Sequence, residues 1–489
     1  MMMMTVLESP SATVSQQQQQ WIDDTNNLTL ACLACPTQAE TLRLLGINLE
    51  GLQGLTSETA PTFRPIVSKK HRGLAWPIAK GLLKQAAGVV PSPVMLTHIV
   101  TTRCNYSCPF CSFADSLNQK TNDLTLEEID QTYATIGNSL NTIVYSGGET
   151  TVNSQLAEII ESAYVRTPVQ SVYIISNAWK PERLIEITHQ VLQRCPELHL
   201  TWSLSIEGPR AYNNSVRSTK AKDWDAWHNT IQTLFALKQL KETFGYTQLD
   251  VQLCTVCTPE NHALLPAWYG LVRDVLKPDK WNLNLMRRSV QMEGSALASF
   301  HERRQQEGLE PFEQTYIEVT RQLRMDALQG RLGFNYHTGT PIEGAMKAAT
   351  DLLSQEMNQR TLLQQPALVG CKAGLTGAYL SNTGLVGGCE EFVHNAQSPK
   401  AYGSVREANY DFMAVWHSEQ AKQWRQLTNC ATECVGCTLE SQRNYPAMLL
   451  SPRTLLQSYG LGKQLLQGAE RFSPHPIVEH LTVPQVMAD

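Results

Sequence analysis

The chain has 489 residues, of which 42% are hydrophobic and 17% are charged, and its formal net charge is -5. This length predicts about two to four domains with a large core, as in ordinary soluble globular proteins. The charge balance gives no indication of a nucleic-acid partner held by bulk electrostatics. No apolar run approaches the roughly 18 residues that a membrane-spanning helix needs.

The N-terminal stretch MMMMTVLESPSATVSQQQQQ has neither the basic start nor the apolar core of a signal peptide. We therefore expect a cytoplasmic protein, whose thirteen cysteines are reduced and serve metal or redox roles more readily than disulfides. The glutamine run predicts a disordered tail over residues 1–30.

Residues 31–94 are predicted as an N-terminal helical segment. Cys32 and Cys35 form a CxxC pair in it, for which helical packing and a metal role both stay open. Residues 69–90 combine lysine and arginine with leucine and isoleucine. This basic stretch is either a helix packed on the rest of the protein or a surface that contacts a membrane or lipid.

Six β-rich runs alternate with helical patterns over the next part of the chain. The runs are LTHIVTTR, TIVYSG, SVYIIS, LHLTWSLSI, LDVQLCTVC and WNLNLM. The helix after the first run is the best marked, since Thr125 and Glu128 fit a capping box. Strands alternating with helices indicate a parallel sheet. We predict an α/β fold in which residues 95–290 form a partial (β/α)6 TIM-like barrel, with catalytic groups at the C-terminal ends of the strands.

Three further segments follow the predicted barrel. Residues 291–365 are polar and lack strong strand signals, which predicts a helical insertion. Residues 366–445 are rich in cysteine and glycine and predict a small Cys-rich C-terminal domain. Residues 446–489 contain several prolines and are predicted to be a C-terminal tail.

Cys104, Cys108 and Cys111 directly follow the first predicted strand. Structural zinc usually takes four protein ligands, and the nearest fourth candidate, His98, lies inside that strand at its wrong end. Three thiolates on a [4Fe–4S] cluster would instead leave one iron open for an outside ligand. An iron–sulfur electron carrier or a zinc-binding module is the non-enzyme alternative.

The spacing Cys-x3-Cys-x2-Cys after a first strand resembles that of the radical S-adenosylmethionine (radical SAM) enzymes. This resemblance implies a [4Fe–4S] cluster whose open iron chelates S-adenosylmethionine. It also implies reductive cleavage to a 5′-deoxyadenosyl radical that abstracts hydrogen from a substrate, with the protein orienting and shielding the cofactor. An electron donor such as flavodoxin or ferredoxin is implied as a partner.

Seven other positions resemble that family's cofactor contacts. They are Phe110 near the adenine, Gly147, Gly148 and Glu149 of SGGET as the GGE motif, Asn177 and Ser205 near the ribose, and Arg217 near the carboxylate. Glycines after the second strand would let the backbone approach a ligand closely. A structural role explains Asn177, Ser205 or Arg217 about equally well. No catalytic acid or base is assigned, because the radical itself is the reagent.

A second group of cysteines resembles the SPASM/Twitch extension of many radical SAM enzymes. Its members are Cys371, Cys389, Cys430, Cys434 and Cys437. The spacing from Gly384 to Cys389 fits that extension, whereas a full SPASM domain has more of the later cysteines. The resemblance therefore implies one auxiliary [4Fe–4S] cluster, with one cysteine of the five to spare. Four thiolates would also satisfy a structural zinc.

The resemblance implies a peptide or small molecule as the substrate, without identifying it. The basic stretch motivates an alternative, a radical SAM enzyme that acts on a lipid or isoprenoid.

Overall fold

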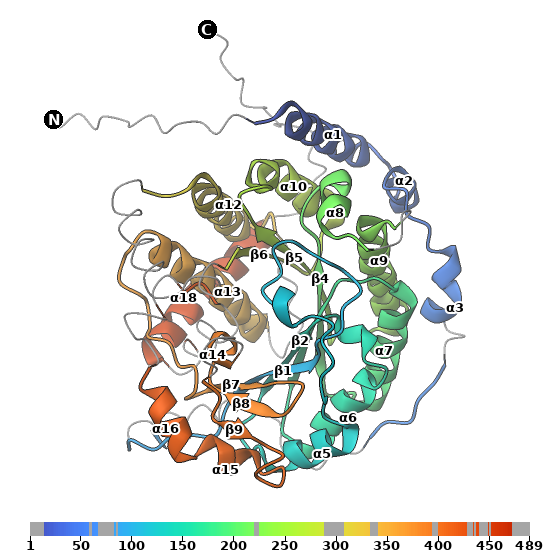
Figure 1. The fold of residues 1–489 in the computed structure, drawn as a ribbon. Coiled ribbons are helices and arrows are strands. Elements are labelled where there is room, and N and C mark those ends of the chain that lie inside the picture. The colour runs from blue at the N-terminus through green and yellow to red at the C-terminus, as the bar shows by residue number, and fades with distance from the viewer. Residues whose placement is uncertain are drawn as a thin grey trace, which may run out of the picture.

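The computed structural model describes residues 14–57, 61–66, 83–84, 87–219, 224–287, 308–332, 341–393, 400–427, 434, 437–439, 448 and 451–471. A single sheet forms the centre of the fold, and helices lie on both of its sides (Figure 1). Most of the basic stretch at 69–90 lies outside the described residues. None of the helices in the described part of the chain has the length and apolar character that crossing a bilayer requires.

Six parallel strands follow one another across the sheet in chain order. They are β1 (Met95–Thr101), β2 (Thr142–Gly147), β3 (Ser171–Ser176), β4 (His199–Ser205), β5 (Leu249–Cys257) and β6 (Lys280–Leu285). Each coincides with a predicted run to within one or two residues at either end. β6 is an edge strand and does not pair with β1, so the sheet stays open. The predicted α/β fold with a partial barrel is confirmed.

Three short strands from the C-terminal part of the chain extend the sheet beyond β1. β7 (Gly377–Leu380) pairs parallel with β1, and β8 (Leu385–Gly387) and β9 (Gly403–Ser404) then add antiparallel. The Cys-rich segment predicted as a small domain is therefore joined edge to edge with the barrel (Figure 1). This pairing joins strands about 280 residues apart in sequence, which no local pattern reports.

Crossover helices cover the outer face of the sheet (Figure 1). They are α5 (Leu126–Thr135), α6 (Leu156–Arg166), α7 (Pro181–Arg194), α9 (Ala226–Phe244) and α10 (Leu265–Leu271), with the short α8 (Arg210–Val216) after β4. The capping box of α5 is confirmed: the Glu128 N–H donates to Thr125 Oγ1 at 3.3 Å, and the Thr125 N–H donates to Glu128 Oε2 at 2.8 Å.

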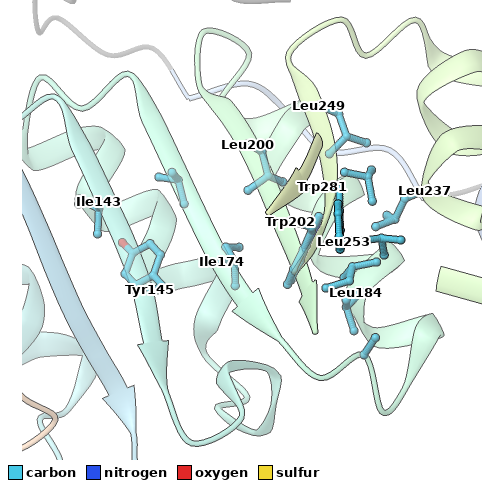
Figure 2. Packing of buried hydrophobic residues seen from close by; sticks show 14 of the residues in the cluster. Ile143, Tyr145, Ile174, Leu184, Leu200, Trp202, Leu237, Leu249, Leu253 and Trp281 are labelled. Carbon is cyan, nitrogen blue, oxygen red and sulfur yellow. The ribbon is translucent and has the colours of Figure 1, made fainter. Parts of the chain in front are cut away.

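The main core lies between the outer face of the sheet and these helices. Leu200, Trp202 and Leu253 from the strands pack toward Leu184 of α7 and Leu237 of α9 (Figure 2). Alternate residues of a strand point to opposite faces, so this apolar set leaves the intervening residues of β4 and β5 on the inner face of the barrel.

The predicted disordered tail over residues 1–30 is wrong for its second half, because α1 (Gln16–Leu33) is a helix. Ser15 and Gln18 form a capping box at its start, and its buried side packs against α10. Cys32 belongs to that buried side and is 5% exposed, so packing explains it. The glutamine run was interpreted as a low-complexity, disordered segment, but glutamine is also a good helix former. α2 (Gln38–Leu44), a short turn (Glu50–Leu52) and α3 (Gln53–Thr56) follow.

The predicted tail over residues 446–489 is likewise wrong where α18 (Pro452–Arg471) packs along α13 (Pro341–Leu362). A Cβ on Gly462 would lie 3.1 Å from the Met346 nitrogen, so the two helices approach closely. Pro452 suggested irregular structure, but proline is tolerated in the first turn of a helix.

The segment predicted as a helical insertion at 291–365 contains α12 (Pro311–Leu328) and α13. α13 lies against the inner face at the N-terminal ends of the strands. Asp351 of α13 forms a 2.9 Å ion pair with Lys280 at the start of β6, and Lys347 Nζ lies 5.2 Å from the ring centroid of Tyr173 on β3. The inner face is therefore covered at this end.

Candidate active site at the C-terminal ends of the strands

The loop after β1 carries the cysteine triplet of Cys104, Cys108 and Cys111, and Asn118 clamps it. The Cys104 N–H donates to Asn118 Oδ1 at 2.9 Å, and Asn118 Nδ2 donates back to the Cys104 carbonyl at 3.0 Å. Asn118 has a φ of 59°, a left-handed conformation that asparagine tolerates better than most residues. Sequence reasoning missed Asn118, because only the fold brings it back to Cys104.

The three thiols of the triplet are free and half-buried. Burial raises the pKa of all three, that of Cys104 to about 11. Burial therefore disfavours the thiolate form of each thiol when no cation is bound. Three soft sulfur donors in one loop suit an iron–sulfur cluster with one open iron. The donor set fits the group that the sequence predicts.

The two glycines at the end of β2, Gly147 and Gly148, are required by the protein's own backbone. Gly147 has a φ of 132°, and a Cβ on it would lie 2.2 Å from the Thr101 carbonyl oxygen. A Cβ on Gly148 would lie 2.3 Å from the carbonyl oxygen of Arg103. These glycines hold the base of the triplet loop against the end of β2. Approach to a ligand, the predicted reason for them, remains a prediction.

Glu149 braces the ends of β2 and β3. Its side chain is almost entirely buried, at 1% exposed. Oε1 accepts from Ser176 Oγ at 2.7 Å and from Thr151 Oγ1 at 2.5 Å, and Oε2 accepts from the Asn177 N–H at 2.6 Å. Burial raises the pKa of Glu149, although these hydrogen bonds favour its charged form. Its predicted role as a cofactor contact within the GGE motif remains a prediction.

Asn177, at the end of β3, reaches the triplet. Its Nδ2 donates to Asn105 Oδ1 at 2.9 Å and lies 4.0 Å from Cys104 Sγ. Its Oδ1 accepts from the Trp179 N–H at 3.1 Å. Asn177 is therefore held beside the first cysteine, and its predicted place near the cofactor ribose remains a prediction.

Arg217 lies on the other side of the triplet. Its guanidinium Nη1 is 3.9 Å from Cys108 Sγ, and its Cζ is 5.7 Å from the ring centroid of Phe110. The same guanidinium forms a buried ion pair with Glu207, whose Oε2 accepts from the Val256 N–H at 2.7 Å. Burial opposes the charge on Arg217, but Glu207 and Cys108 raise its pKa. In this structure the carboxylate on Arg217 is that of Glu207, and the predicted place of Arg217 near the cofactor carboxylate remains a prediction.

Ser205 ends β4 on the inner face and is half-buried. Its register partner on β5 is Cys254. Its predicted contact with the cofactor ribose remains a prediction.

Four of the five C-terminal cysteines are described, and Cys430 lies outside the described residues. Cys371 and Cys389 flank the β7–β8 hairpin, and a Cβ on Gly388 would lie 2.7 Å from the Gly374 Cα. The two loops that carry these cysteines are thus in backbone contact. Burial raises the pKa of Cys389, and the neighbouring Glu391, Cys437 and Cys371 add to the effect.

Arg287, just after β6, joins the barrel to this C-terminal group. It forms an ion pair with Glu390 and lies 3.7 Å from an oxygen of Glu391, next to Cys389. Across the described residues, no three His, Cys, Asp or Glu side chains converge on a site for one metal ion. Arg288, another charged residue of this stretch, lies outside the described residues.

The segment from β1 to α9, which holds the triplet, matches a known family. Residues 98–243 match the model of the Radical SAM superfamily. This part of the chain is a radical SAM domain, and the chain is an enzyme that contains this domain.

Several solved structures are similar in fold. One is anSMEcpe with bound AdoMet and Cp18Cys peptide, at 13% identity and a TM-score of 0.47, with 77% of this chain and 99% of that chain covered. Another is Streptococcus suis SuiB bound to S-adenosylmethionine, at 14% identity and a TM-score of 0.43, with 76% of this chain and 77% of that chain covered. A third is BtrN in complex with AdoMet and 2-DOIA, at 11% identity and a TM-score of 0.34, with 72% of this chain and 98% of that chain covered. At these low scores and identities, the similarities carry no conclusion about substrate or reaction. No curated protein sequence matches the chain.

Proposed function

We propose that this enzyme reductively cleaves S-adenosylmethionine and abstracts a hydrogen atom from a peptide or small-molecule substrate. The observation that carries the proposal is the cysteine triplet, which lies at the C-terminal ends of the strands between Asn177 and Arg217. A [4Fe–4S] cluster bound by the triplet would supply the electron that breaks the cofactor's sulfonium bond.

The residues around the triplet would hold such a cluster and shield it. Asn118 fixes the backbone of Cys104, and Arg217 places positive charge beside Cys108, which stabilises a thiolate there. α13 covers the opposite end of the barrel. Water would therefore reach the site mainly from the loop side, which favours chemistry that needs water excluded.

The first experiment is anaerobic reconstitution, followed by measurement of 5′-deoxyadenosine after reduction with dithionite. Cys108→Ala should abolish 5′-deoxyadenosine and reduce bound iron by about four atoms per chain. Cys35→Ala is the matched control, since the Cys35 thiol donates only to the Ala31 carbonyl in its own helix turn, and it should keep both. No 5′-deoxyadenosine from the wild-type chain would refute the proposal.

We also propose an auxiliary [4Fe–4S] cluster on four of Cys371, Cys389, Cys430, Cys434 and Cys437. The backbone contact at Gly374 and Gly388 and the mutual influence of Cys371, Cys389 and Cys437 support it. The reconstituted wild type should hold about eight iron and about eight sulfide, and Cys389→Ala should lose about half of each. Zinc at one equivalent with only four iron would establish the structural-zinc alternative.

A flavodoxin or ferredoxin is proposed as the electron donor. Because cluster thiols need a reducing compartment, we propose a cytoplasmic location. The lipid or isoprenoid alternative rests on the basic stretch at 69–90. Exchange of Lys69, Lys70 and Arg72 for glutamine tests it without removing α1, which packs on α10. Equal flotation of the variant and the wild type with anionic liposomes would remove the motivation for this alternative.

A further inference from the structure

The inner face of the barrel opposite α9 and α10 is polar. Strand alternation sets it apart from the apolar outer face, to which Trp202, Leu253 and Trp281 belong (Figure 2). The inner positions are Ser203 and Ser205 on β4, Gln252 and Cys254 on β5, and Asn282 and Asn284 on β6. The strand register makes them neighbours: Ser203 pairs with Gln252, Ser205 with Cys254, and Cys254 with Asn282.

From the Ser203–Gln252 pair to the C-terminal ends of the strands, two buried polar atoms on this face have no hydrogen-bond partner among the described residues; two more, Thr201 Oγ1 and Asp250 Oδ1, lie nearer the N-terminal ends. Of the first two, one is the donor Nε2 of Gln252, whose side chain is only 3% exposed, and the other is the acceptor Oδ1 of Asn284. The Asn284 amide is held in place, because its Nδ2 donates to Cys254 Sγ at 3.4 Å. Native proteins leave few buried polar groups unsatisfied, so this donor and this acceptor on one face are available to a polar ligand.

This polar face adjoins the cysteine triplet. The Glu207 carboxylate bonds both Arg217 and the Val256 N–H, and Arg217 lies 3.9 Å from Cys108 Sγ. Val256 follows Cys254 by two residues on the same face and is the register partner of Asn284. Electrostatic influence of Cys254 on the pKa of Arg217 agrees with this placement. The face therefore begins beside the triplet and runs toward α13.

The two unpartnered groups are separated along the strands. Gln252 and the register partner of Asn284 are four residues apart on β5, which is about 13 Å at the rise of a strand. A single small amide does not span that distance, whereas an extended chain with repeated carbonyl and N–H groups does. A hydrocarbon chain would leave both groups unsatisfied, at a cost to its own binding.

We infer that the inner face of β5 and β6 binds a peptide segment that enters the barrel, with Gln252 donating to a carbonyl near its tip and Asn284 accepting from an N–H nearer the triplet. This inference rests on the proposed function and names the substrate class of the same site. Gln252 and Asn284 determine specificity in it and take no part in the radical chemistry.

The first test is the stability of the substrate-free protein. Gln252→Leu removes a buried donor that has no partner, so its Tm should equal or exceed that of the wild type. Gln190→Leu is the matched control, because Gln190 Nε2 donates to Glu161 Oε1 at 2.9 Å, and its Tm should fall. A Tm of Gln252→Leu that falls as far as that of the control would show a structural role and overturn the inference.

The second test is binding by the reconstituted full chain with S-adenosylmethionine bound. A random library of mRNA-displayed peptides is selected on the wild type, and the Kd of an enriched peptide is then measured on each variant. Gln252→Leu and Asn284→Leu should each weaken binding about tenfold, as expected for a lost buried hydrogen bond, while Gln53→Leu on the exposed surface of α3 should not.

Several outcomes would overturn the inference. The first is that the selection enriches no peptide, and the second is that all variants bind the enriched peptide equally well. The third is that N-methylacetamide, maltohexaose or geranylgeraniol vesicles compete for the site whereas peptides do not. Formation of 5′-deoxyadenosine by the wild type separates the two claims. If the wild type forms it and the variants bind peptide as tightly as the wild type, only the inference fails; if the wild type does not form it, the proposed function fails.

Discussion

The close contact between the end of β2 and the triplet loop can be tested by Gly148→Ala. The new Cβ would lie 2.3 Å from the carbonyl oxygen of Arg103 and 2.9 Å from the carbonyl carbon of Thr102. Both neighbours are backbone atoms that cannot rotate aside, so the loop itself must move. Moving it breaks the hydrogen bond from the Glu149 N–H to the Arg103 carbonyl, which is 2.8 Å long.

The expected cost lies at the upper end of the range for overpacking, about 3 kcal/mol. Since about 1.4 kcal/mol is a tenfold change in an equilibrium constant, the opened state of the loop should become roughly a hundred times more populated. Amide hydrogen exchange reports such local opening. The Asn118 N–H, which donates to the Thr102 carbonyl at 3.0 Å, should exchange correspondingly faster.

Iron content supplies a second readout for Gly148→Ala. After reconstitution the variant should lose the iron of the triplet and keep that of the C-terminal group. Gly270→Ala is the control, because a Cβ there meets nothing within 4 Å and alanine favours its helix. Wild-type exchange together with wild-type iron in Gly148→Ala would refute the argument that the glycine is needed for backbone contact.

Three other outcomes follow from contacts at the site and at the start of α5. Glu207→Ala leaves Arg217 buried without its partner and should lower the free energy of unfolding by about 3–5 kcal/mol in urea; exchange of both residues for methionine should recover most of the loss, and no recovery would contradict the reasoning. Asn118→Gly keeps the left-handed backbone but removes the clamp on the triplet loop, so it should bind less triplet iron than the wild type, whereas equal iron would show that the clamp is dispensable. The hydrogen bond from Arg406 lowers the pKa of Glu128 to about 2; because the folded pKa is below the unfolded one, the stabilisation is present above about pH 4.3 and is lost as the pH falls toward 2. Glu128→Gln should therefore be less stable than the wild type at pH 7, by roughly 1 kcal/mol at this partly exposed pair, and a stability difference that is independent of pH would contradict this assignment.

The sequence alone predicted much of the candidate site, because its signals are local. Cys104, Cys108 and Cys111 lie within one loop, and their spacing needs no tertiary information. Asn177 was predicted from the resemblance to radical SAM enzymes. It follows a strand, and parallel strands bring their C-terminal ends to one edge of a sheet. The fold buries Glu207 against Arg217, and strand alternation alone does not reveal this ion pair.

What the sequence by itself determined is the set of barrel elements, since each strand carries its own apolar run and α5 its own capping box. Only the tertiary structure decided that β7 joins β1, that α1 and α18 are packed helices, and that Gln252 and Asn284 share one polar face. The reason is physical. Periodicity and capping act over a few residues, whereas edge pairing, helix docking and unsatisfied buried groups depend on contacts between residues far apart in the chain.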